Sequence, residues 1–174
     1  MAIDRTSKGA FAERHPRAKR GVAAEFLRRV RDKLPYRVHT VLTDNGVPFT
    51  PQPHQFLPGG HRFDRVCREY GVARRLTKPA HPWTNGQVER MNRTIKEATV
   101  QRFHDQTTAE LNEHRQAFLL AYNHAKRLKT LRGLTPHEFV CTQWQNNPTI
   151  FTRDPTHLPL GLYTYVAGGD RQDR

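Results

Sequence analysis

Apolar residues recur every three or four positions between residues 21 and 34. Val22, Phe26 and Val30 are spaced four apart in "GVAAEFLRRVRDKL", and further apolar side chains flank them. This spacing places them on one face of a helix, with the charged positions on the other face. The pattern therefore predicts an amphipathic helix over 21–34 that ends before Pro35.

The same spacing predicts three more helices further along the chain, over about 60–70, Asn85 to Phe103 and 108–127, and start signals predict a short fourth one after Thr135. Two of these helices have start signals in the sequence. Thr84 and Gln87 fit a capping box, and Thr135, Pro136 and Glu138 fit a second one with proline at the first position. Beyond "QWQNNP" the chain is rich in Pro, Thr and Gly, so an extended or loosely ordered tail is expected.

Four short segments have the composition of strands. "MAID" and "GAFAERH", joined by the turn-prone "RTSKG", predict a hairpin, whereas "YRVHTVLT" and "VARRLTK" predict single strands. The order of strands and helices predicts an α/β fold with its strands in the first half of the chain. Asp44 follows the third segment directly, and the next residues, Asn45 and Gly46, are typical of turns.

Charge then favours one class of partner. The 174 residues contain 29 Lys and Arg against 16 Asp and Glu, a formal net charge of +13. This balance favours a polyanion, with nucleic acid first and an anionic membrane surface second. No apolar run approaches the ~20 residues of a membrane span. We therefore expect a DNA partner, no membrane and an intracellular location.

Cysteine and histidine usage does not favour a zinc site. Cys67 and Cys141 form no CxxC pair, so we expect buried, inert thiols in a reducing compartment. The tightest group of possible zinc ligands is His54, His61 and Cys67, which lacks a fourth ligand and paired spacing. Hydrogen-bonded or solvated histidines are the interpretation that we favour.

Three acids fall on three different predicted elements. Asp4 lies in the first strand, Asp44 at the end of a later strand, and Glu89 in the first turn of a helix. If the fold brings them together, their carboxylates form an oxygen-rich site for Mg²⁺ or Mn²⁺. Taken singly, Asp44 is explained as a turn residue and Glu89 as an acid favoured by the helix dipole.

Three segments resemble the acidic motifs of a known family. "AIDRTSKGAFAE", "VLTDNGVPFT" and "HPWTNGQVERMNRTIKEA" resemble, in order, motifs of the integrase catalytic core found in bacterial insertion-sequence transposases and retroviral integrases. The resemblance implies an α/β, ribonuclease H-like mixed sheet flanked by helices, with the first strand shortened. It also implies a catalytic core over 1–140, truncated at its N-terminus, and a C-terminal extension over 141–174.

The resemblance also implies site residues and a reaction. Asp4, Asp44 and Glu89 become a metal-binding catalytic triad in which Asp4 bridges two ions and each of the others holds one. The reaction is DNA transposition or integration by metal-dependent phosphoryl transfer, with Mg²⁺ or Mn²⁺ as cofactor. The partners are transposon ends and target DNA, the active form is a homo-oligomer, and the location is the bacterial cytoplasm at the nucleoid.

The predicted helix that contains Glu89 also presents cations. Arg93 and Lys96 follow Glu89 by four and seven residues, so all three share one face. We favour DNA contact by this face over a merely solvated one, and the matching motif adds Trp83 and Asn85 as DNA-binding candidates. Two other functions stay open. One is a non-catalytic nucleic-acid-binding remnant, and the other is a metal-dependent nuclease of the same fold.

Overall fold

The computed structural model describes residues 1–15, 20–51, 60–77, 86–98 and 108–157. The elements in chain order are β1 Ala2–Ile3, β2 Ala10–Phe11, α1 Arg20–Lys33, β3 Thr40–Thr43, α2 Arg62–Glu69, β4 Ala73–Leu76, α3 Gly86–Ala98, α4 Thr108–His124, η2 Lys129–Leu131, α5 Pro136–Asn146 and η3 Pro148–Ile150. Helices are present at all five predicted positions. The boundaries of α1 agree with the prediction to within one residue.

Two helices differ in extent from the prediction. The predicted start signal of α3 at Thr84, and the part predicted beyond residue 98, lie outside the described residues. Helix α5 is longer than expected and runs to Asn146, so the boundary expected at residue 140 falls inside it. Of the expected extended or loosely ordered tail, the structure describes the residues up to 157. The chain forms η3, and Phe151 then pairs with Tyr36 in an isolated antiparallel bridge.

The strands form two ladders rather than the single mixed sheet expected from the sequence. In the predicted hairpin β1 pairs with β2 antiparallel, and Ala2 lies opposite Phe11. Strand β3 pairs with β4 in parallel, from Thr40 opposite Ala73 to Thr43 opposite Leu76. Among the described residues no ladder joins β1 to β3. Within the predicted strand "YRVHTVLT", only Thr40–Thr43 form β3, and Tyr36 instead makes an isolated bridge with Phe151.

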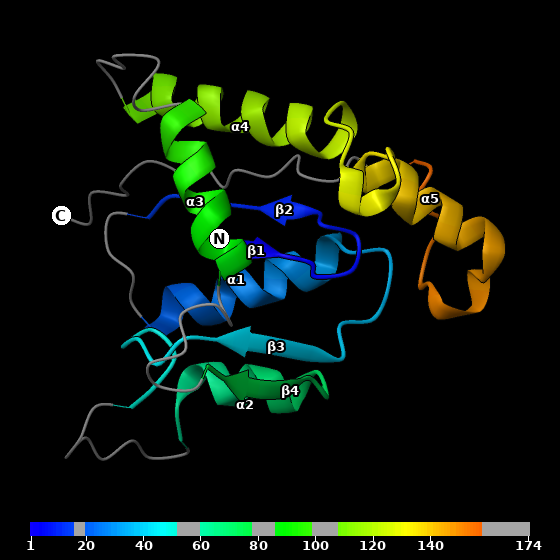
Figure 1. Cartoon of the computed structure of the whole chain (residues 1–174). Coiled ribbons are helices and arrows are strands. Elements are labelled where there is room, and N and C mark those ends of the chain that lie inside the picture. The colour runs from blue at the N-terminus through cyan, green and yellow to red at the C-terminus, as the bar shows by residue number, and fades with distance from the viewer. Residues whose placement is uncertain (16–19, 52–59, 78–85, 99–107, 158–174) are drawn as a thin grey trace, which may run out of the picture.

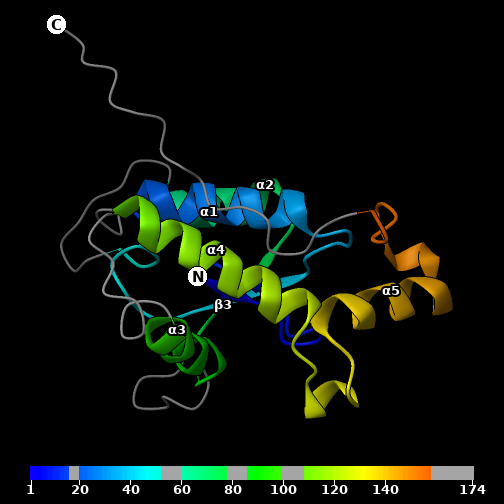
Figure 2. The same ribbon diagram turned by 90° about the horizontal axis from the view of Figure 1, so that it is seen from above.

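Helices cover both faces of the strands. Seen from above, α1 and α2 lie on one side of the strands and α3 on the other (Figure 2). In Figure 1, α3 stands across β1, which it contacts, and its far end reaches α4. None of the helices in the described part of the chain is long and apolar enough to cross a membrane.

Helix α1 contacts the apolar residues of both ladders. Its first half contributes Ala24 and Leu27 to a buried cluster with α2, against which Val41 of β3 packs. Its second half contributes Val30 to another cluster with Phe11 of β2. Burial of one large apolar side chain contributes about 1.5–3 kcal/mol, so these contacts are a main attraction between the ladders.

A buried asparagine joins α4 to the hairpin. Asn123 is 0% exposed. Its Oδ1 accepts a hydrogen bond from the Ala10 backbone N–H at 2.9 Å, and its Nδ2 donates to the Ala10 carbonyl at 2.9 Å. The amide side chain thus takes the place of a neighbouring strand at the free edge of β2. Buried backbone groups need such partners, and the sequence analysis did not identify this one.

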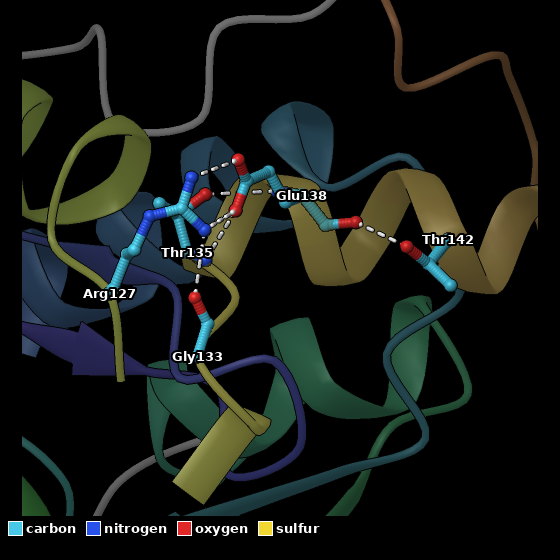
Figure 3. A network of polar contacts seen from close by, with 5 residues as sticks. All are labelled: Arg127, Gly133, Thr135, Glu138 and Thr142. Carbon is cyan, nitrogen blue, oxygen red and sulfur yellow. Dashed lines mark hydrogen bonds and ion pairs between the residues drawn. The ribbon is translucent and has the colours of Figure 1, made fainter. Parts of the chain in front are cut away.

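The link between α4 and α5 is a hydrogen-bonded turn (Figure 3). Thr135 Oγ1 accepts from the Glu138 N–H at 3.1 Å, and Glu138 Oε2 accepts from the Thr135 N–H at 2.9 Å, which confirms the predicted capping box. Arg127 donates to the Gly133 carbonyl at 2.9 Å and also contacts Glu138. This arrangement fixes the direction in which α5 leaves α4.

We predict that Asn123→Ala lowers the free energy of unfolding by about 2–4 kcal/mol, because two buried backbone groups of Ala10 lose their partners. Urea denaturation followed by circular dichroism measures the change. Asn146→Ala, at an exposed position on α5, is the matched control and should change the value by less than about 0.5 kcal/mol. Equal effects of the two substitutions would contradict the role given to Asn123.

Candidate functional site

Asp44 opens a tight, hydrogen-bonded turn at the end of β3. Its Oδ1 accepts from the Gly46 N–H at 2.9 Å, and the Phe49 and Thr50 N–H groups both donate to the Gly46 carbonyl at 2.9 Å. A Cβ atom at residue 46 would lie 2.8 Å from Asp44 Oδ1, so any larger residue there would have to displace the Asp44 side chain. The turn chemistry therefore explains Gly46. It leaves the Asp44 side chain exposed.

The turn is also tied to the neighbouring strand. Asn45 Nδ2 donates to the Thr77 carbonyl at 3.2 Å, directly after the end of β4. Thr77 in turn donates its N–H to the Thr43 carbonyl at 2.9 Å, which extends the β3–β4 ladder by one bond. Hydrogen bonds thus fix the backbone on both sides of Asp44.

Helix α3 presents the predicted polar face to solvent. Met91 and Ile95 are 6% and 8% exposed and pack into a cluster with Leu119 of α4. Glu89, Arg93 and Lys96 are all exposed, as the helical spacing predicts. No hydrogen bond or ion pair of Glu89 is found among the described residues. An exposed carboxylate in the first turn is favoured by the positive end of the helix dipole, and the cations follow it along the helix.

The carboxylate of Asp4 is already occupied by hydrogen bonds. Its Oδ2 accepts from Ser7 Oγ and Tyr36 OH, each at 2.6 Å, and from the Ser7 N–H at 3.2 Å. Its Oδ1 accepts from the Thr6 N–H at 3.0 Å. Burial by itself raises the pKa of Asp4, but hydrogen bonds from Ser7, Tyr36 and Thr6 outweigh it and hold the pKa below its usual value. Asp4 closes the β1–β2 turn and ties it to Tyr36.

Strand direction separates Asp4 from Asp44. The arrows of β2 and β3 point the same way in Figure 1, and β1 is antiparallel to β2. The ends of β1 and β3, which Asp4 and Asp44 follow, therefore lie at opposite sides of the strand layer. Within the described residues, no three acidic, histidine or cysteine side chains are placed to hold a metal ion. The structure does not bring the three predicted carboxylates together.

Asp44 and helix α3 lie at the same side of the strand layer. Both views place α3 beside the end of β3 from which Asp44 follows. Asp44 keeps Oδ2 without a hydrogen-bond donor among the described residues, and Glu89 is exposed. These two carboxylates fit the oxygen chemistry of Mg²⁺ or Mn²⁺, which is commonly bound by one or two protein carboxylates together with substrate phosphates. Asp4 does not fit beside them, because it lies at the opposite side of the strand layer and its carboxylate already accepts four hydrogen bonds.

Two of the predicted DNA-binding residues remain to be located. Trp83 and Asn85, the remaining DNA-binding candidates, lie outside the described residues.

Sequence reasoning missed Ser7 and Tyr36 as partners of Asp4. The Asp-x-x-Ser spacing was a usable signal, since Asp side chains often accept from backbone N–H groups two or three residues on. Tyr36 gave no such signal, because its contact is made only in the folded chain.

His61 and Cys67, two of the zinc ligands considered from the sequence, are both buried. His61 is 1% exposed, and its Nδ1 accepts from the Phe63 N–H at 3.2 Å at the start of α2. Burial lowers the pKa of His61, which favours the neutral ring that this cap requires. Cys67 is buried as expected, whereas Cys141 is partly exposed.

Comparisons with known proteins agree with this architecture. Residues 70–136, which include α3 but neither Asp4 nor Asp44, match the Integrase core domain family. Over 100 residues the chain is 36% identical to the Pol polyprotein of Feline endogenous virus ECE1, which covers 56% of this chain and 8% of that protein. The chain therefore spans a small part of this relative.

A solved structure gives the fold. The chain is similar to one in the cryo-electron microscopy structure of the simian T-cell lymphotropic virus intasome in complex with PP2A regulatory subunit B56 gamma, with a TM-score of 0.61 and 23% identity. The likeness covers 72% of this chain and 42% of that one. The chain thus has the expected ribonuclease H-like α/β fold, and over residues 70–136 its sequence is similar to the Integrase core domain family.

Proposed function

We propose that this chain acts on DNA in integration or transposition, as part of a metal-dependent phosphoryl transferase. The observation that supports this most directly is the exposed Asp44 at the end of β3, beside a helix that presents Glu89, Arg93 and Lys96 to solvent. The match to the Integrase core domain family includes that helix.

Asp44 and Glu89 are the residues that would hold Mg²⁺ or Mn²⁺. When bound, the ion supplies Lewis-acid activation of a phosphate and of the attacking oxygen. Asp44 suits this role because its turn fixes the backbone while one carboxylate oxygen stays open. Glu89 suits it because no partner among the described residues competes for its carboxylate. Asp4 is left out of the proposal, since its carboxylate is committed to the hairpin.

Arg93 and Lys96 would bind the DNA backbone. They lie one and two turns beyond Glu89 on an exposed face, and Arg90 adds a third exposed cation to the helix. Cations in this position hold phosphates near the carboxylates without reading sequence. The net charge of +13 adds long-range attraction for DNA.

The setting of this activity is part of the proposal. Paired DNA ends require more than one subunit, and the similar chain comes from an intasome. We therefore propose a homo-oligomer when active, encoded by a bacterial insertion sequence and located with the nucleoid. Because the chain spans 8% of the Pol polyprotein and 42% of the intasome chain, other segments of a longer protein could contribute to the full reaction.

A second function is favoured by one observation. The described residues contain no group of three acidic, histidine or cysteine side chains placed for a metal ion. A chain that binds DNA through its basic surface without cleaving it accounts for that finding. The nicking experiment below separates the two proposals.

We predict that the protein nicks labelled duplex DNA with Mn²⁺ or Mg²⁺, and that Asp44→Asn and Glu89→Gln each abolish nicking. Each substitution removes a negative charge with little change of shape, so folding and DNA binding should persist. Asp4→Asn is the matched control and should still nick, at a rate corrected for the folded fraction. Loss of nicking in all three variants would return Asp4 to the site. A parent that binds DNA but is inert with both metals would favour the binding-only function.

We predict that Arg93→Ala and Lys96→Ala each weaken DNA binding and reduce the slope of log affinity against log salt concentration by about 1. Fluorescence anisotropy with unrelated duplexes at several salt concentrations measures this slope. Lys129→Ala, at an exposed position on η2, is the control for loss of one positive charge and should keep the parent slope. Equal losses at Lys96 and Lys129 would show that binding is not localised to α3.

A further inference from the structure

We propose that Arg74 is a positioning residue for Asp44, acting through Thr50 at the far end of the Asp44 turn. The inference rests on the proposed function only in its last step, where the position of Asp44 affects metal binding. The contact through which Arg74 holds the turn is tested separately, without a metal ion.

Arg74 joins β4, α2 and the turn. The side chain is only 14% exposed, and its guanidinium forms an ion pair with Asp64 in the first turn of α2. Its second terminal nitrogen donates to Thr50 Oγ1 at 3.3 Å. One planar, fork-shaped group therefore contacts two elements at once, which a lysine cannot reproduce with the same geometry.

Aromatic side chains enclose the same region. Phe49, next to Thr50, packs edge-on against Phe63 of α2 with ring centroids 5.1 Å apart. The Arg74 guanidinium lies 5.8 Å from the centroid of the Phe63 ring. Removal from water strengthens the polar contacts of Arg74 and makes their loss more damaging.

The turn transmits the position of Thr50 to Asp44. Thr50 donates its N–H to the Gly46 carbonyl, and Gly46 donates its own N–H to Asp44 Oδ1, each at 2.9 Å. A shift of Thr50 therefore acts on Gly46, the residue whose N–H orients the Asp44 carboxylate. Carboxylates that hold metals depend on such supporting contacts, whose loss commonly weakens metal affinity by 10–100-fold.

Strand pairing places Arg74 and its neighbour Arg75 on opposite faces of the β3–β4 ladder, so the positioning role is assigned to Arg74 alone. Arg74 lies opposite Val41 in the β3–β4 ladder, and its side chain is partly buried. Arg75, opposite Leu42, projects to the other face of the ladder and is exposed. The two neighbouring arginines have the same charge and different contacts, so Arg75 provides a matched control.

The test uses Arg74→Met, Arg74→Lys, Thr50→Val and the control Arg75→Met. Hydrogen–deuterium exchange measures the Phe49 and Thr50 amides, with the α4 amides as an internal reference. Thr50→Val and Arg74→Lys should each speed exchange of these two amides about tenfold, the ratio expected for loss of a hydrogen bond. Combining the two should add little, because both remove the same contact. Arg75→Met should match the parent.

Mn²⁺ titration is the second readout. In a parent that binds Mn²⁺, Thr50→Val and Arg74→Lys should weaken Mn²⁺ binding about tenfold while salt-dependent DNA binding stays unchanged. Unchanged exchange and unchanged Mn²⁺ affinity in both variants would overturn the positioning role. A parent that does not bind Mn²⁺ would refute the proposed metal site instead, and the exchange data would still decide whether Arg74 anchors the turn. Should Arg74→Met fail to fold, Thr50→Val alone gives the result.

Discussion

Apolar contacts of α1 hold together two pairs of strands that share no ladder in the described part of the chain. The first half of the helix packs with α2 beneath β3, and the second half packs against the hairpin. Because these contacts are non-directional, they set the distance between the ladders and not their register. Register within each ladder comes from backbone hydrogen bonds, and the edge of β2 is satisfied by Asn123. Everything that lies on the strand ends therefore depends on how α1 packs.

The direction of each strand decides which acids can act together. A tight hairpin reverses the chain, so Asp4 ends up in the turn after β1, at the side of the layer opposite to the end of β3. Its carboxylate is then used inside the fold, by Ser7 and Tyr36. The Asp44 carboxylate, by contrast, is only partly used by hydrogen bonds inside the fold. Its turn consumes one carboxylate oxygen and leaves the other open, next to a helix whose exposed face contains Glu89 and cations.

Burial and exposure divide the charged groups into two kinds. Arg74 is largely buried, and its ion pair with the more exposed Asp64 connects β4 to α2. Glu89, Arg93 and Lys96 lie in solvent, where their contribution to stability is small and their charges can meet a polyanion. The structure around each residue thus decides whether its charge is paired inside the fold or left exposed to solvent.

The sequence by itself determined the local elements. Helical spacing located α1, α2 and α4, the Thr135–Glu138 pair located the start of α5, and the exposed face of α3 followed from the position of Met91 and Ile95. These features depend on contacts between residues close in the chain, which a pattern records directly. The turn at Asp44 was also predicted from Asn45 and Gly46, but neither residue has the positive φ that these residue types commonly adopt in turns.

Only the tertiary structure decided which distant residues meet. Nothing in the pattern around Asp4 showed that Tyr36 would occupy its carboxylate, or that β1 would run opposite to β3. Asn123 and Ala10 are 113 residues apart, and Arg74 reaches Thr50 across 24. Such contacts arise from the packing of whole elements, in which a single strand reversal moves a side chain to the other end of the layer. That physical fact left the grouping of the acids undetermined by sequence.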